Sequence, residues 1–511
     1  MSTVKIGWAR REISTNEPVS IPGQMYIRVS EGVHDPLYVT ALCVDGGEGQ
    51  DKIIFLSCDI VTQFGGILQP IRDKLRQHRP EIPEEGFILN VTHTHSSVAL
   101  GETPAKTPDG VEIYSGLKTR DFFCEMAAQA IIEAWDTRKE GGIGYGYGYA
   151  VVGHSRRSVY FKEEKLALNA EGPRQFMTPS GYATMYGKTN HPLFSHYEAG
   201  ADHFMNLMFT FDEKQKLTGI VVNVPCPSQL CEHFTKLSAD YWGFVRELVA
   251  KEYGPDVFVL PQCAAAGDVS PRTLHYIQAQ ARRMRLKYGK TYVPGHMKED
   301  PSYEYNKSIT ECMDIAERIM EGIKDVYSWA KKDIKTEVAV RHRVTQMELE
   351  RRKITDEEKA WCEENLEILK DMEPKAEDMT PEEFRKELSN YNSKVRRNRG
   401  GIERCEDVKK NPNLTMQSHT VQIGDIAFAT IRFETYIDFM HRLQARSPFI
   451  QTFVMQLAGT EGGNYLATHR GAEAKGYSAS MFCNMVSADG GQQWVENQLQ
   501  ILNEMKAQDE Q

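Results

Sequence analysis

The chain has 511 residues, which is too long for one small core, so we expect one large domain with insertions or two to three domains. Its hydrophobic fraction of 41% and charged fraction of 26% are those of an ordinary soluble globular protein. The formal net charge of −10 excludes global electrostatic attraction to nucleic acid or to an anionic membrane.

The N-terminal stretch MSTVKIGWARREIS has charges where a secretion signal would need an apolar core. No apolar run approaches the length of a membrane span, so we expect no stable membrane association. The ten cysteines include no CxxC pair, and several lie in apolar surroundings. This pattern is typical of reduced thiols and predicts a cytoplasmic protein.

The first half of the chain alternates strand-like and helical patterns. Residues 38–47 and 51–61 read as neighbouring strands joined by a glycine-rich turn, and residues 65–79 have the apolar spacing of a helix. A buried strand follows at residues 86–95, and an amphipathic helix at residues 119–139. The order predicts a mixed α/β fold in which layered β-sheets are flanked by helices.

Two histidines, His93 and His95, follow the apolar run of residues 87–91. On an extended backbone, residues i and i+2 point to the same side. The pair is either two hydrogen-bonded rings at a polar strand end, or a metal ligand beside a substrate-binding histidine. Strand ends of α/β sheets are favoured positions for active sites.

Residues 141–153 read GGIGYGYGYAVVG and contain GxGxG, but no helical pattern follows. A dinucleotide-binding loop is therefore not expected. Strict alternation of glycine and tyrosine predicts a strand with tyrosines on one face and glycines on the other, where another element approaches closely.

The composition changes between residues 347 and 411, which are highly charged, helix-prone and carry the capping signal TPEE. Strand-like sequence lies on both sides. We therefore predict a catalytic domain made of residues 1–346 and 412–511, with residues 347–411 inserted as a charged helical arm. A solvated helical hairpin explains the arm without a function, and a partner-binding arm is the alternative.

Further polar residues occur at strand ends or in Gly/Pro-rich stretches, namely Cys226, Asp268 with Ser270, Glu434, and Tyr465 with Tyr477. Each has a structural explanation when taken singly. A free cysteine is usually a small core residue, a serine before proline caps a turn, and a buried glutamate pairs with a base. Their occurrence together with His93 and His95 favours a site.

The ordered set of motifs resembles the neutral, non-lysosomal ceramidases and their relatives, which share a zinc-dependent amidase domain. The resemblance rests on THTHS at residues 92–96, SRRS at 155–158, GDVSP at 267–271, FET at 433–435 and the twelve-residue step between two tyrosines. It runs in order from the N-terminus to about residue 481, interrupted by the charged arm.

Carried over residue by residue, the resemblance implies a zinc ion bound by His93, Glu434 and Tyr465. It also implies catalytic or pocket roles for His95, Arg157, Ser270 and Tyr477. A zinc ion with an open position lowers the pKa of its bound water to about 7 and makes it a nucleophile.

The chain departs from the family at the second histidine ligand, where it has Cys226-Pro227-Ser228. Thiolate is a good zinc ligand, so we predict Cys226 as the fourth ligand. Glu232 or His233 is the alternative. The sequence ends soon after Trp494, which leaves no room for the C-terminal β-sandwich of true ceramidases, so ceramide is not the expected substrate.

We therefore expect a cytoplasmic, zinc-dependent hydrolase that cleaves an amide or ester in a small, polar, soluble substrate. A metal-dependent lyase or isomerase of a sugar-like compound and a binding protein that has lost catalysis are the alternatives. The expected partner is a small molecule, with no nucleic acid, and a homo-oligomer is left open.

Overall fold

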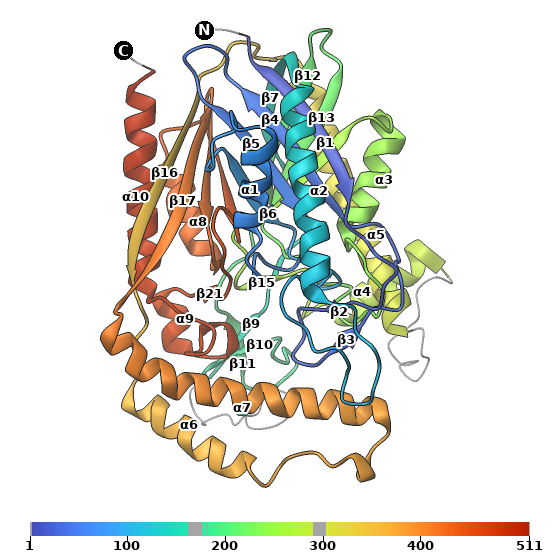
Figure 1. The fold of residues 1–511 in the computed structure, drawn as a ribbon, viewed down its shortest axis with the longest axis vertical. Helices are drawn as coiled ribbons and strands as arrows, with labels where there is room; N and C mark the ends of the chain where they lie inside the picture. Colours follow the sequence, from blue (N-terminus) through green and yellow to red (C-terminus); the bar gives the residue numbers. More distant parts are fainter. Residues whose placement is uncertain (1–2, 162–175, 180, 290–302, 510–511) are drawn as a thin grey trace.

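Two β-sheets packed face to face form the centre of the protein (Figure 1). The computed structural model describes residues 3–161, 176–179, 181–289 and 303–509. The eight-stranded sheet has the order β14 (Phe258–Cys263), β13 (Leu217–Val224), β12 (Phe204–Asp212), β7 (Lys139–Tyr149), β1 (Lys5–Glu12), β4 (Tyr38–Asp45), β5 (Lys52–Cys58) and β6 (Phe87–Val91). The four-stranded sheet has the order β16 (Val340–Glu350), β17 (Asn413–Ile423), β18 (Ile426–Ile431) and β20 (Gln451–Gln456).

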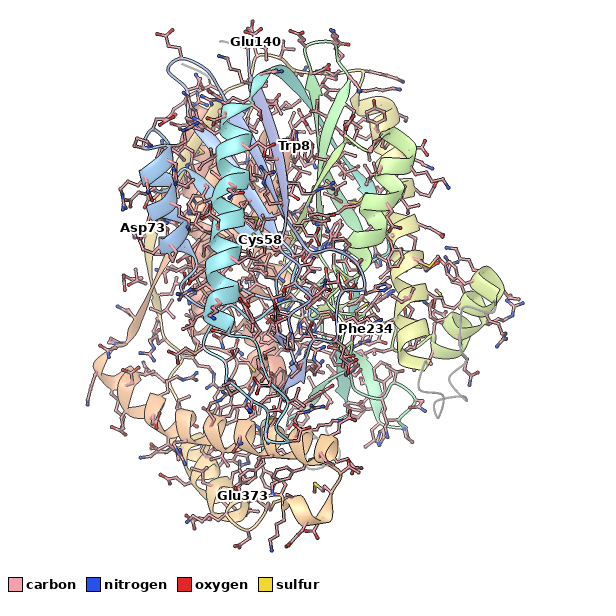
Figure 2. All side chains as sticks on the ribbon, turned by 45° about the vertical axis from the view of Figure 1, so that its right-hand side comes forward. Trp8, Cys58, Asp73, Glu140, Phe234 and Glu373 are labelled. Atoms are coloured by element: carbon pink, nitrogen blue, oxygen red, sulfur yellow. The ribbon has the colours of Figure 1, made fainter. Side chains whose placement is uncertain are left out.

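The facing sides of the two sheets share one apolar core. Phe55 of the large sheet lies against Phe428 of the small sheet with ring centroids 4.9 Å apart, and Phe428 stacks on Phe453 at 4.4 Å. Trp8 on β1, labelled in Figure 2, belongs to the same core. Burying such aromatic rings supplies much of the energy that holds two sheets together.

Helices cover the outer face of each sheet, which gives four layers. The large sheet is covered by α1 (Leu68–His78), α2 (Gly116–Asp136), α3 (Tyr241–Tyr253) and α5 (Tyr303–Ala330), with α4 (Ile277–Tyr288) beyond α5. The small sheet is covered by α8 (Ile437–Arg446) and α10 (Ala488–Ala507). The predicted mixed α/β architecture of layered sheets flanked by helices is confirmed.

The predicted elements of the first half are present. The strands expected at residues 38–47 and 51–61 are β4 and β5, which pair antiparallel, and the buried strand before His93 is β6, parallel to β5. The two expected helices are α1 and α2. All ten cysteines are free and buried, as their apolar surroundings predict.

The glycine and tyrosine alternation forms β7, as predicted. A side chain added at Gly148 would come within 2.7 Å of Val326 on α5, so α5 lies directly on the glycine face. Tyr147 and Tyr149 point to the other side and are 50% and 62% exposed. The absence of side chains on one face is therefore what lets a long helix approach the sheet.

Short elements gather at the lower end of the sheets in Figure 1. They are β2 (Ser20–Ile21), β3 (Arg28–Val29), β8 (His154–Ser155), β9 (Arg157–Tyr160), β10 (Ala183–Met185), β11 (Phe194–Tyr197), β15 (Val269–Ser270), β19 (Glu434–Thr435), β21 (Tyr465–Leu466), α9 (His469–Ala474) and η4 (Tyr477–Ala479). These elements carry most of the residues singled out from the sequence.

The charged arm is a helical hairpin of α6 (Asp356–Leu369), η3 (Ala376–Asp378) and α7 (Pro381–Lys410). Thr355 and Thr380 start the two long helices with complete capping boxes, the second of them in the predicted TPEE signal. The predicted arm began at residue 347, but β16 continues to Glu350, which pairs with Asn413 of β17. The hairpin therefore leaves and rejoins the sheet between neighbouring strands.

The arm crosses the lower end of the molecule (Figure 1). In Figure 2, Glu373 of the arm and Glu140 of β7 mark opposite ends of the protein. A small core of Ile354, Cys362, Cys405 and Met481 attaches the hairpin to the segment after η4. In the described part of the chain, no helix combines the length and the apolar character needed to cross a membrane.

Candidate functional site

The polar segments singled out from the sequence meet at one end of the two sheets. β6 is parallel to β5, β13 to β14 and β18 to β20, and the loops after these strands contact one another. His93 follows β6, Gln229 follows β13, and Glu434 follows β18. The carboxyl ends of strands are where α/β folds place ligands.

Three residues near this end have left-handed backbones although none of them is glycine: His93 with φ 60°, Tyr186 with φ 59° and Asn464 with φ 70°. Such conformations cost about 1–3 kcal/mol each and cluster at functional sites. The predicted extended backbone at His93 is therefore wrong in detail. The two imidazoles nevertheless meet, with ring centroids 4.8 Å apart.

A backbone contact fixes the protonation of the buried His93 ring. Its Nδ1 lies 2.5 Å from the carbonyl oxygen of Val61, which can only accept a hydrogen bond. Nδ1 therefore carries the proton, and a neutral His93 has its lone pair on Nε2. Metal-binding histidines are typically oriented by such a bond from the opposite nitrogen.

The orientation of His95 follows from Gln229. The Arg156 guanidinium, a pure donor, lies 3.2 Å from Gln229 Oε1, so the Gln229 amide nitrogen faces the other way, 3.1 Å from His95 Nε2. The amide N–H therefore donates to His95 Nε2. Burial lowers the pKa of His95 well below its ordinary value, with His93 adding to the effect, so His95 is a neutral ring with its proton on Nδ1.

Glu434 and Tyr465 are held side by side as register partners on the short strands β19 and β21. The Glu434 Oε2 atom lies 3.5 Å from His93 Nε2, and the Tyr465 hydroxyl donates to the same carboxylate. Burial would raise the pKa of Glu434, but His93, Arg156 and Tyr465 outweigh it, so its pKa lies below the ordinary value. The carboxylate is therefore ionised at neutral pH.

The lone pair of His93 Nε2 thus faces acceptor atoms. Its neighbours are His95 Nε2 at 3.3 Å and Glu434 Oε2 at 3.5 Å. Acceptors that face one another require a shared cation, either a proton or a metal ion. Two atoms bound to one tetrahedral zinc ion at about 2.0–2.1 Å lie about 3.3–3.4 Å apart, so His93 and Glu434 fit such an ion.

Of the two adjacent arginines, the one at this cluster is Arg156, whereas the sequence prediction named Arg157. The Arg156 Nη2 atom lies 2.8 Å from Gly267 O, 3.2 Å from the Tyr465 hydroxyl and 3.6 Å from Glu434 Oε2. Successive side chains alternate along an extended backbone, so Arg157 points the opposite way.

Arg157 is fully buried away from His93. Its guanidinium lies 2.5 Å from Glu198, donates to Ser478 and donates to the carbonyl of Lys475. These contacts tie β9 to the segment that leads from α9 into η4. The predicted pocket role of Arg157 is therefore not what the geometry favours.

Ser270 and Tyr477 occupy different surroundings. The buried Ser270 hydroxyl accepts a hydrogen bond from the backbone N–H of Arg272, as in the turn-capping interpretation. The Tyr477 ring lies edge-on to Tyr465 with centroids 6.2 Å apart, and its hydroxyl accepts a hydrogen bond from Arg397 of α7. Tyr477 is therefore at the cluster, whereas Ser270 supports the loop behind it.

The structure does not bring Cys226 to His93 and Glu434. Val222, Val224 and Cys226 follow each other at every second position and all point into the main apolar core. Burial raises the pKa of the Cys226 thiol well above its ordinary value, which opposes the thiolate form.

The alternative ligands face elsewhere. Glu232 forms an ion pair with Arg272, and His233 is half exposed and lies beside Glu232. The carboxylate of Glu232 is 3.9 Å from His95 Nδ1. Within the described residues, no other His, Cys, Asp or Glu joins both His93 and Glu434 within 4.8 Å. Gln229 is the residue that the structure places beside the histidines.

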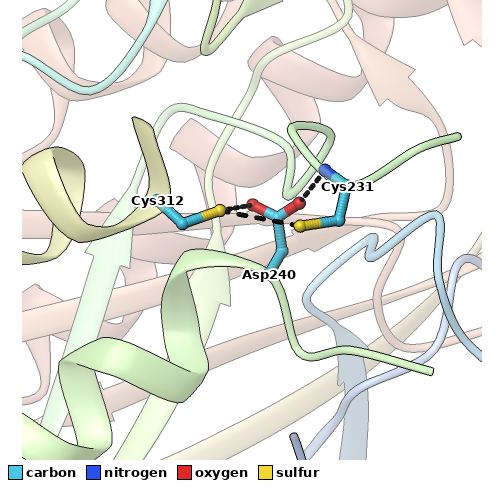
Figure 3. A group of neighbouring side chains, drawn as sticks. All are labelled: Cys231, Asp240 and Cys312. Carbon is cyan, nitrogen blue, oxygen red and sulfur yellow. Dashed lines mark hydrogen bonds between the residues drawn. The ribbon is translucent and has the colours of Figure 1, made fainter. Parts of the chain in front are cut away.

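Among the described residues, the one group of three His, Cys, Asp or Glu side chains with the spacing of a metal site is Cys231, Asp240 and Cys312, all buried (Figure 3). The Cys312 thiol lies 3.5 Å from Asp240 and 3.8 Å from Cys231. The Asp240 carboxylate already accepts the backbone N–H groups of Cys231 and Tyr241 at the start of α3. Burial raises the pKa of Cys231 to about 11, so its thiol is protonated at neutral pH.

Some of the buried polar atoms without a hydrogen-bond partner among the described residues lie around the histidines. They belong to Thr92, His95, Arg156 and Ser228. Such atoms are rare in protein interiors because each costs about 1–3 kcal/mol. A polar ligand beside the histidines would supply hydrogen-bond partners for them.

Sequence reasoning missed three residues of this arrangement: Arg156, Gln229 and Arg397. The doubled arginine in SRRS was a signal, but choosing between neighbours requires the strand register. Gln229 lies three residues after the expected ligand Cys226, and its neutral amide is not a residue type that indicates a metal ligand or a catalytic acid or base. Arg397 lies in the arm, far from any other site residue in sequence.

Three comparisons with known proteins bear on this arrangement. No family model matches the chain, and no curated protein matches its sequence. Among solved structures, neutral ceramidase from Pseudomonas aeruginosa matches with a TM-score of 0.63 at 14% identity, over 99% of this chain and 75% of that one. A structure described as ceramidase complexed with C2 matches equally well, over 76% of its length. The chain therefore has the fold of a neutral ceramidase.

Proposed function

We propose that the protein is a hydrolase that cleaves an amide or ester bond in a small, polar, soluble substrate. The observation that carries the proposal is the pairing of His93 Nε2 with Glu434 Oε2 at 3.5 Å, beside the buried cation of Arg156. The shared fold with neutral ceramidase supports hydrolysis over the lyase, isomerase and binding alternatives.

His93, Glu434 and Tyr465 would hold a zinc ion. When bound, such an ion lowers the pKa of its water to about 7 and polarises a carbonyl oxygen. Cys226, predicted as the fourth zinc ligand, points into the apolar core, and Gln229 lies beside His95 instead, where its amide sets the position of the proton on the His95 ring. The fixed amide leaves the proton of His95 on Nδ1, which lies 3.9 Å from the Glu232 carboxylate.

Arg156 is the residue placed to stabilise negative charge. Its Nε–H is buried and has no partner among the described residues, while its Nη atoms are fixed by Gln229, Gly267 and Tyr465. A donor held in place before the reaction can stabilise an oxyanion without reorganisation. Arg156 would therefore bind the carbonyl oxygen as it gains charge.

Ceramide is not the substrate that we propose. The segment beside Tyr477 comes from the charged helix α7 and presents a guanidinium rather than an apolar surface. We also infer a reducing, cytoplasmic setting, which the ten free and buried cysteines support.

Metal analysis of purified variants tests the proposal first. His93→Ala should lose most of the zinc bound per chain, whereas His95→Ala and Cys226→Ala should keep it. His469→Ala, at a position with a 74% exposed side chain, is the control for a histidine change. Equal metal in wild type and His93→Ala would remove the ion from this site.

Product analysis of the metal-loaded protein follows. A panel of N-acyl amino acids and simple esters should yield free acid together with amine or alcohol. His95→Ala should bind metal and release about 100-fold less product or lower still, because it loses the imidazole that lies 3.3 Å from His93 Nε2. Products that form without uptake of water would favour the lyase or isomerase alternative.

A further inference from the structure

The arm reaches the candidate site through one side chain. Arg397, in the middle of α7, donates from Nη2 to the Tyr477 hydroxyl at 2.9 Å, and its guanidinium carbon lies 5.2 Å from the Tyr477 ring centroid. Its Nη1 atom lies 3.8 Å from the thiol of Cys483. The backbone carbonyl of Cys483 accepts the N–H of Tyr465. A single phenol ring therefore separates Arg397 from the Tyr465–Glu434 pair.

The charge of Arg397 is not balanced within the described part of the protein. Its hydrogen-bond partners are a phenol and a thiol, and it forms no ion pair with any described carboxylate. The other arginines around the site differ in this respect. Arg156 faces Glu434, Arg157 pairs with Glu198, and Arg272 pairs with Glu232.

A half-buried guanidinium without a carboxylate is costly, because part of its hydration is lost without compensation. A guanidinium carries five N–H groups, and Arg397 uses only two of them in these hydrogen bonds. Ser480, in the turn after η4, adds a buried hydroxyl that has no partner among the described residues. The chain thus presents one cation and unused donors beside the proposed reaction centre.

We propose that Arg397 recognises a carboxylate group of the substrate, so that the arm makes the protein selective for anionic amides or esters such as N-acyl amino acids. The inference rests on the proposed hydrolase function and names its substrate class. One guanidinium matches the charge and the fork geometry of a single carboxylate. Arg397 would bind the acid end of the substrate while Arg156 faces the scissile carbonyl.

A structural role for Arg397 predicts a different outcome. If the guanidinium only holds Tyr477 in place, its loss weakens the binding of all substrates to the same extent. If Arg397 recognises a carboxylate, its loss weakens the binding of only those substrates that carry one. Matched pairs of charged and neutral ligands therefore separate the two roles.

The experiment uses the full-length, metal-loaded protein and N-acetyl amino acids with small, aliphatic and aromatic side chains. Each acid is compared with its C-terminal amide by isothermal titration calorimetry. Wild type should bind at least one acid about tenfold more tightly than its amide, and Arg397→Gln should remove that preference. Arg396→Gln and Arg399→Gln, at exposed positions of the same helix, should keep it.

Arg397→Lys, which keeps the charge but not the fork, should restore part of the preference and serves if the glutamine variant does not fold. Equal binding of every acid and its amide by wild type overturns the inference, as does an equal loss for acids and amides in Arg397→Gln. If the binding preference is present but no probe is hydrolysed, the proposed hydrolase function fails, whereas carboxylate binding by Arg397 stands.

Discussion

Arg156 and Arg157 are both fully buried, yet their partners differ in kind. Arg156 contacts a carboxylate, a phenol and an amide that all belong to the candidate site, whereas Arg157 joins Glu198 to the carbonyls of a neighbouring turn. A step of one residue along the chain therefore separates a proposed chemical role from a structural one.

Substitutions at the two positions should behave differently. Arg157→Ala leaves Glu198 buried without its partner, so we expect a loss of about 3–5 kcal/mol in the free energy of unfolding. Arg156→Lys keeps a cation but loses the fixed fork, so we expect a fall of about tenfold or more in kcat/KM with little change in unfolding. Chemical denaturation and steady-state kinetics measure the two effects.

The sequence prediction of Arg157 as the pocket arginine would hold if Arg157→Lys lost activity without losing stability. Arg156→Lys would then have to keep its activity. Glu198→Gln is the matched control. It removes the ion pair from the other side and should reduce stability while leaving substrate binding unchanged.

At the residue scale, the sequence was informative where a side chain ends an apolar run. His93 and Glu434 were singled out on that ground and Tyr465 by its Gly-rich surroundings, and the structure brings the three together, although their roles stay predictions. Cys226 was singled out in the same way, but it continues the core-facing side of β13. Side chains alternate between the two faces of a sheet, so a shift of one residue at a strand end moves a side chain from the site to the core.

Helix α8 begins on a buried carboxylate. Asp268 accepts the backbone N–H of Ile437 at 3.0 Å, and its second oxygen has no hydrogen-bond partner among the described residues. Burial raises the pKa of Asp268 from 3.8 to about 7, with Glu198 and Asp438 adding to the effect. The motif GDVSP therefore anchors a helix through a group that is protonated below neutral pH.

This raised pKa predicts how stability depends on pH. Below 3.8 the carboxyl is protonated in both states, and between 3.8 and about 7 only the unfolded chain ionises, so stability falls as the pH rises through this window. Asp268→Asn should remove that fall and gain a few kcal/mol relative to wild type above about pH 7. Urea denaturation across the range measures the difference, and the exposed Asp121→Asn variant should match wild type.

The glycine face of β7 makes a separate prediction. In Gly148→Ala the added methyl group would meet Val326 at 2.7 Å and the carbonyl oxygen of Gly322 at 3.3 Å. We expect a loss of about 1–3 kcal/mol as α5 is displaced. Gly200→Ala, where the added carbon meets nothing within 4 Å, is the control, and a similar Tm for both variants would contradict the packing argument.

Elements were easier to predict than individual contacts. Apolar patterns extend over a whole element, from the 5 residues of β6 to the 21 residues of α2, so α1, α2, β4, β5 and β6 follow from the pattern alone. Pairs such as Glu434 with Tyr465 depend on two-residue strands, which carry no periodicity. Such contacts emerge only when the whole chain is packed.

At the scale of the whole molecule, the sequence predicts that the arm is a solvated helical hairpin, with a partner-binding arm as the alternative. The structure shows that α7 contacts Tyr477 and shares a small core with the segment after η4. The prediction for the metal itself is unchanged, because none of His93, Glu434 and Tyr465 lies on the arm.

Replacing residues 354–409 by a short Gly/Ser linker should therefore leave zinc content per chain near that of wild type. The preference for acids over amides should disappear, and stability should fall because Cys362 and Cys405 no longer pack on Met481. Metal analysis and calorimetry on the same preparation measure both. A folded protein without zinc would show that the arm is part of the metal site.

The junction between β16 and β17 has a consequence for how this protein can be altered. Glu350 and Asn413 are register partners, so the chain departs and returns across a single ladder position. A segment inserted there adds only a loop-closure term that grows slowly with its length. The position can accept hairpins of other lengths and charges while the strands stay in register, so designed exchanges at this point replace the side chains beside Tyr477 without rebuilding the strand ends that carry His93 and Glu434.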